Sequence, residues 1–98
     1  MNKQELLEKI GKLNQAAEGL EEPDKTFALN DVSRLKIYLE GMSIQDIAEK
    51  MSSISLPDIT EMEEAIEVAS NSIKSQEQRV NAFNKAFSFI KTSLSIVV

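Results

Sequence analysis

Apolar residues recur three and four positions apart along most of the chain, the spacing that places side chains on one face of an α-helix. The first run predicts a helix over residues 3–18. Asn2 and Glu5 precede and open it with the separation of a capping box. Gly19 follows, where a left-handed residue commonly ends a helix. The apolar positions of this run are Leu6, Ile10, Leu13, Ala17 and Leu20.

Two further runs predict a second and a third helix before Pro57. The start of the second is open between Asp24 and Asn30, because both residue types cap helices well, and Gly41 marks its end. Its apolar side carries Ala28, Val32, Leu35, Leu39 and Met42. The third helix is short and opens at Ser43. Its inward positions are expected to be Ile44, Ile47, Ala48 and Met51.

The most regular pattern follows Leu56-Pro57-Asp58, a helix start in which Asp58 suits the N-cap. Neither Gly nor Pro interrupts it, and acidic side chains gather near its start while basic ones come later, which favours the helix dipole. We therefore predict one continuous helix over residues 58–97, with Gln76 as the one polar member of its apolar seam. The seam consists of Ile59, Met62, Ile66, Ala69, Ile73, Gln76, Val80, Phe83, Phe87, Ile90, Leu94 and Val97.

The length of this helix raises a geometric problem. It would measure about 58 Å, whereas a domain of this size is only about 30–35 Å across. A break near residues 70–76 is the alternative, because Ser70-Asn71-Ser72 are poor helix formers. The unbroken seven-residue phase favours the continuous helix, which would bury part of its stripe on another chain. The predicted fold is an all-α bundle of three shorter helices plus a long C-terminal helix, in a single domain over residues 1–98.

The C-terminal half of the long helix is the strongest candidate functional surface. Three of the four phenylalanines fall within seven residues, and further apolar residues widen the arc beyond one contact seam. The arc fits either the central helix of the bundle or a surface for a partner protein. Gln76 either sets the register of such a contact or marks a partly exposed position. The predicted interface consists of Ile73, Gln76, Val80, Phe83, Phe87, Phe89, Ile90 and Leu94.

The residue inventory argues against catalysis. The chain has no His and no Cys, so the usual general base near neutral pH, the thiolate nucleophile and the soft metal ligands are missing. The glutamates that open the long helix lie mostly off its apolar stripe, which indicates a solvated face rather than a set of metal ligands. We expect no enzyme activity, no catalytic residue, no cofactor and no metal.

Net charge of −5 without a basic patch makes nucleic acid an unexpected partner. No apolar stretch is long enough to cross a membrane or form a signal peptide, and the absence of Cys fits the cytoplasm. The predicted function is a non-enzymatic helical protein–protein interaction module that self-associates, as a homodimer, through its C-terminal helix. One alternative is a small acidic adaptor or chaperone that binds a partner helix. Another is a DNA-binding regulator with a degenerate helix-turn-helix at 43–68, whose recognition helix would present carboxylates to DNA.

Overall fold

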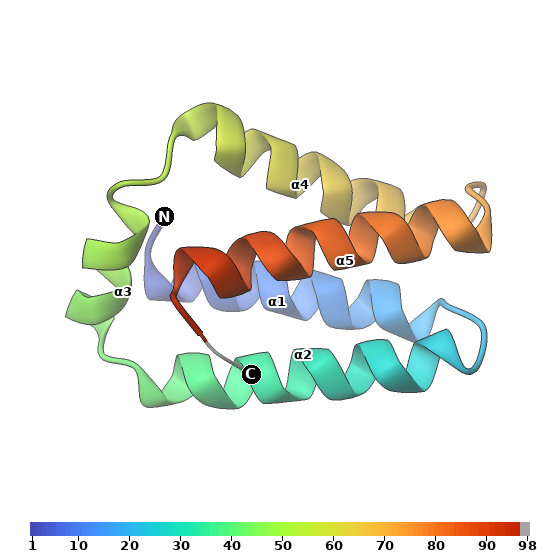
Figure 1. The fold of residues 1–98 in the computed structure, drawn as a ribbon, viewed down its shortest axis with the longest axis horizontal. Coiled ribbons are helices and arrows are strands. Elements are labelled where there is room, and N and C mark those ends of the chain that lie inside the picture. The colour runs from blue at the N-terminus through green and yellow to red at the C-terminus, as the bar shows by residue number, and fades with distance from the viewer. Residues whose placement is uncertain (97–98) are drawn as a thin grey trace.

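Four helices lie side by side and a short fifth helix closes one end of the bundle (Figure 1). The computed structural model describes residues 1–96. In chain order the helices are α1 (Lys3–Glu18), α2 (Asp24–Gly41), α3 (Ile44–Met51), α4 (Leu56–Ser70) and α5 (Gln76–Ser93). The prediction of an all-helical bundle is confirmed, and α1 has the predicted bounds. The side-chain oxygen of Asn2 accepts a hydrogen bond from the backbone N–H of Glu5 at 2.8 Å, which is one half of the predicted capping box.

The prediction of a continuous helix over residues 58–97 is wrong, because α4 ends at Ser70 and α5 begins at Gln76. Two polar residues specify the turn. The Asn71 side-chain oxygen accepts from the backbone N–H of Ile73 at 3.0 Å, and Ser75 forms a full capping box with Gln78. Such local side-chain bonds to the backbone compete with helix continuation. The break lies within the alternative range of 70–76, whereas Val97 lies outside the described residues.

The turn lets the two halves of the apolar stripe cover one another. α4 packs closely against α5 along the hairpin, and the longest dimension of the molecule is 37 Å. Ile73 continues the seven-residue repeat through the turn, but its side chain is 91% exposed. The repeat at this position therefore does not reflect a buried contact. The length of the predicted helix therefore no longer argues for a partner chain.

The core lies between the four long helices, and α3 covers one end of it with Ile47 and Met51. Ile44 and Ala48, predicted to face inward, are exposed instead. Ala48 would have to pack against the next helix in a helix-turn-helix, so its exposure argues against that alternative. The largest fully buried side chains are Phe83, Leu6, Ile10, Leu13, Leu35, Leu39, Ile47, Met62, Ile90 and Leu94.

The residues that cap α2 and α4 differ from the predicted ones. The Ser55 hydroxyl, rather than Asp58, caps α4 and accepts from the Asp58 backbone N–H at 3.2 Å. α2 begins at Asp24 after Pro23, which forms no side-chain cap. The carboxylate of Glu22 takes that role, because it accepts from both the backbone N–H and the hydroxyl of Thr26 at 2.8 Å.

This arrangement predicts a pH-dependent contribution from Glu22. The hydrogen bond from the Thr26 hydroxyl, followed by that from its backbone N–H, holds the pKa of the Glu22 carboxyl below its ordinary value. The ionised form therefore favours folding above the pKa of the unfolded chain, and this contribution disappears as the pH falls through the folded-state pKa. A carboxyl-detected NMR titration is expected to show the low value, and Thr26→Val is expected to raise it. An unchanged titration in that variant would contradict the hydrogen-bond explanation.

Candidate functional site

The edge between α2 and α5 is the loosely packed side of the bundle. α1 packs against both α2 and α4, and α4 packs against α5, whereas α2 and α5 contact each other sparsely. The two helices run in the same direction (Figure 1). Side chains from both helices line the resulting groove, so this edge is one of the concave surfaces of the bundle.

One line of side chains follows the flank of α2 that faces the groove. Phe27, Asp31, Arg34 and Tyr38 are separated by four, three and four residues, which keeps them in one row along a helix. Each residue of the row precedes a buried residue of α2 by one position in the sequence. The aromatic residues at the two ends of the row are solvent-accessible. Phe27 is 64% exposed and Tyr38 is 48% exposed. We call these four residues the α2 row.

A matching line on α5 forms the other wall of the groove. Val80, Asn84, Phe87 and Lys91 lie four, three and four residues apart, and Val80 and Phe87 are half-buried. The Phe87 ring stacks on that of Phe83 with centroids 6.1 Å apart. The Lys91 ammonium nitrogen lies 5.8 Å from the centroid of the Phe87 ring, within the range of a cation–π interaction.

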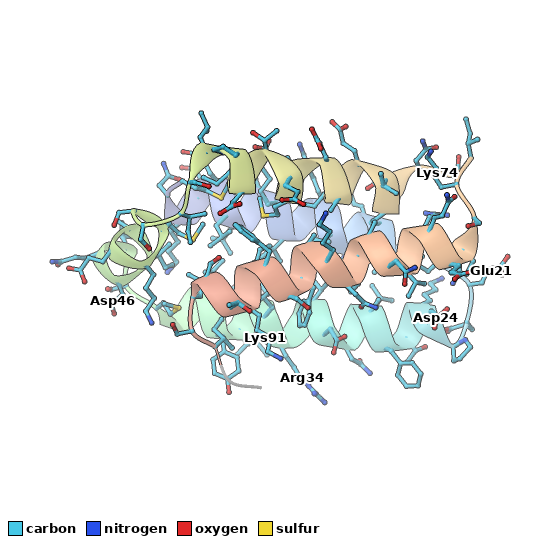
Figure 2. All side chains as sticks on the ribbon, turned by 45° about the horizontal axis from the view of Figure 1, so that its top comes forward. Glu21, Asp24, Arg34, Asp46, Lys74 and Lys91 are labelled. Carbon is cyan, nitrogen blue, oxygen red and sulfur yellow. The ribbon has the colours of Figure 1, made fainter. Side chains whose placement is uncertain are left out.

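The floor of the groove contains two small hollows. One, of ≈ 180 Å³, lies between Phe27, Val80 and Asn84. The other, of ≈ 70 Å³, lies between Arg34, Phe87 and Lys91. Pockets for drug-sized molecules measure about 300–1,000 Å³, so these hollows suit single side chains of a partner better. Figure 2 shows Arg34 and Lys91 on this side of the bundle.

Gln76 closes one end of the groove. Its amide oxygen accepts from the Glu21 backbone N–H at 3.2 Å, and its amide nitrogen donates to the Glu21 carbonyl at 3.2 Å. The same nitrogen donates to the Asp24 carboxylate at 3.0 Å. Glu21 and Asp24 are labelled in Figure 2 at the end of the bundle where α5 begins. The polar interruption of the apolar seam therefore binds the α1–α2 connector.

Arg79, one turn further along α5, ties the same connector to the α4–α5 hairpin. Its Nε donates to the carbonyl of Ala69 at 2.9 Å, and its Nη1 donates to the carbonyl of Gly19 at 3.1 Å. A Cβ atom at Gly19 would lie 2.5 Å from Nη2 of Arg79. Gly19 has a helical φ of −83° rather than the predicted left-handed conformation, so a larger residue there would displace the Arg79 guanidinium rather than strain the backbone. We call Gln76 and Arg79 the α5 clasp.

Three of the eight predicted interface residues belong to the core of the chain itself. Phe83, Ile90 and Leu94 are almost fully buried. Their apolar spacing reflects packing within the bundle, and their assignment to an external surface is corrected accordingly. Ile73 lies exposed in the α4–α5 turn, and Gln76 belongs to the α5 clasp. Neither is part of the groove walls.

The remaining three predicted residues lie on two flanks of α5. Val80 and Phe87 line the groove, whereas Phe89 lies on the opposite flank, beside Ser53 and Ile54. The structure thus brings two of the eight residues together on one candidate surface. Sequence reasoning missed the α2 row, although its spacing of four, three and four was a usable signal. The α2 row lies beside the buried apolar stripe of α2, and the apolar periodicity identified that stripe instead of the row.

No protein-family model, curated protein or solved structure matches this chain. Residues 1–96 contain no group of three or more carboxylates placed to hold a metal ion. Within the same residues, no helix has both the length and the apolar character needed to span a membrane.

Proposed function

We propose that this chain is a non-enzymatic protein–protein interaction module that self-associates as a homodimer through the groove between α2 and α5. The observation that carries the proposal is the α2 row, which places two exposed aromatic side chains beside a groove that already contains Phe87. Aromatic residues are enriched at protein interfaces and supply much of their binding energy. An exposed apolar surface with a polar rim is a recurrent mark of such sites.

The chemistry of the groove supports a protein partner. Its charged side chains are of both signs, as expected for the polar part of a protein interface. They are Asp24, Asp31, Arg34 and Lys91. A basic stripe, which would favour nucleic acid, is not what lines it. A helix laid along the groove would present side chains every three or four residues to both walls. The absence of Cys fits the cytoplasm, and we propose that the chain acts there.

Replacing Phe27 with glutamate tests the proposal. Sedimentation and light scattering of the wild-type chain are expected to give a mass near twice the 10.9 kDa of one copy. Phe27→Glu is expected to shift the equilibrium to the monomer, because an aromatic anchor contributes about 2 kcal/mol or more to an interface. The substitution lies on an exposed position and is expected to leave the helical circular dichroism unchanged.

Ile73→Glu is the matched control. It also exchanges an exposed large apolar residue for a glutamate, but at the α4–α5 turn and away from the groove. We expect this variant to dimerise like the wild type. A wild-type chain that stays monomeric at every concentration would overturn the proposal. Equal loss of dimer in both variants would show that the groove is not the interface.

A further inference from the structure

We infer that the occupant of the groove is the α2 helix of a second copy, laid antiparallel on the α2 row across a two-fold axis. This inference rests on the proposed self-association and specifies its geometry. Read in either direction, the α2 row is aromatic, charged, charged, aromatic. Its two halves mirror one another about the midpoint between Asp31 and Arg34.

The row is complementary to itself, because its residue classes are mirrored about the midpoint while its two central charges are opposite in sign. In a two-fold interface, where residue i meets residue j, residue j meets residue i. Antiparallel alignment about that midpoint places Asp31 opposite Arg34 of the second copy, and Arg34 opposite Asp31 of the second copy. It also places Phe27 opposite Tyr38 of the second copy, and the reverse. Two opposite-charge pairs then lie near the axis, and two aromatic pairs flank them.

Both charges near the axis are available for this pairing. Asp31 and Arg34 are three residues apart on one helix, a spacing that often forms an ion pair. Within residues 1–96, however, neither side chain forms a hydrogen bond or an ion pair. Arg34 is exposed and Asp31 is half-buried at the groove. The row therefore presents one unpaired acid and one unpaired base to a partner.

A parallel alignment of the same rows is disfavoured. It would place Asp31 opposite Asp31 and Arg34 opposite Arg34, and like charges facing each other across an interface are repulsive. The aromatic ends reach across about 16 Å of helix, so the contact covers three turns of each α2 helix. The groove wall on α5, with Val80 and Phe87, borders this contact and extends the apolar area available to the second copy.

Charge reversal tests the alignment. Asp31→Arg places two Arg–Arg contacts at the axis, and Arg34→Asp places two Asp–Asp contacts there. Each single variant is expected to raise the dissociation constant of the homodimer by about tenfold or more, since like-charge contacts occur twice. An equimolar mixture of the two variants is expected to form a heterodimer of wild-type affinity, because each copy then faces the opposite charge at both positions.

The reciprocal double variant, Asp31→Arg with Arg34→Asp, is expected to restore the homodimer. Circular dichroism and thermal unfolding of each single variant provide the folding control, and recovery in the mixture requires both to be folded. If Phe27→Glu separates the wild-type dimer while both charge variants still dimerise, the antiparallel alignment is overturned and the proposed function stands. If the wild-type chain is monomeric, both fail. A mixture that stays monomeric after each single variant has lost its dimer would also overturn the alignment.

Discussion

Replacing Phe83 with alanine is expected to lower the free energy of unfolding by about 3–5 kcal/mol. Phe83 is 1% exposed and is among the largest fully buried side chains of the core. Removing its ring leaves a cavity between α5 and the other long helices, and close-packed surroundings fill such a cavity only in part. Typical domains have a total stability of about 5–15 kcal/mol, so the loss would be a large fraction of it.

The other phenylalanines provide a graded control for this prediction. Phe87 and Phe89 are half-buried, and Phe27 is exposed. Urea unfolding, extrapolated to water, is expected to give intermediate losses for Phe87→Ala and Phe89→Ala. For Phe27→Ala it is expected to give almost none in the monomer. A loss at Phe83 no larger than at Phe27 would contradict the packing described for the core.

Replacing Arg79 with methionine is expected to lower the free energy of unfolding by about 1.5–3 kcal/mol, the range for hydrogen bonds that involve a charged group. Methionine keeps much of the apolar stem and removes the guanidinium. The carbonyls of Ala69 and Gly19 would lose their donors at the points where α4 and α1 end. The effect is expected to be larger than for an ordinary surface charge, because one side chain joins two connections.

Two variants separate this explanation from a general effect of charge. Lys36→Met removes one charge of the exposed ion pair between Lys36 and Glu40, whose charged atoms lie 4.0 Å apart. Exposed ion pairs contribute little to stability. Arg79→Lys keeps the charge but lacks the planar fork that reaches two acceptors. We expect no measurable change in the first variant and partial loss in the second. Full stability of Arg79→Lys would show that charge, rather than the paired hydrogen bonds, is what matters.

Phe83 and Arg79 support the groove as well as the fold. Phe83 stacks directly under Phe87 on the α5 wall, and Arg79 lies one turn before Phe83. Loss of either side chain is therefore expected to weaken self-association indirectly, with a parallel loss of stability. Phe27→Glu, by contrast, is expected to weaken self-association at full stability, and that difference distinguishes residues of the surface from those beneath it.

Local patterns in the sequence determined the class of fold and much of its detail. Periodic apolar residues and the caps at Asn2 and Ser43 located α1 and α3. These features depend on neighbours within one or two turns, so they act in the same way in any context. The buried positions of α1 and α2 follow from the same spacing, because an apolar stripe on a helix must face the core.

The sequence left two alternatives at residues 70–76, and the tertiary structure decided for the break. It also decided the roles of Gln76 and Gly19, which contact segments distant in sequence. The hairpin is favoured because α4 and α5 bury their apolar stripes against each other within one chain. In this arrangement Gln76 bonds to Glu21, and Gly19 lies next to the Arg79 guanidinium. Lys50 likewise donates to the carbonyl of Leu94 across 44 residues. Periodicity reports which face of a helix is apolar, but it does not say which segment will cover that face, because contacts between distant segments are formed only when the chain packs.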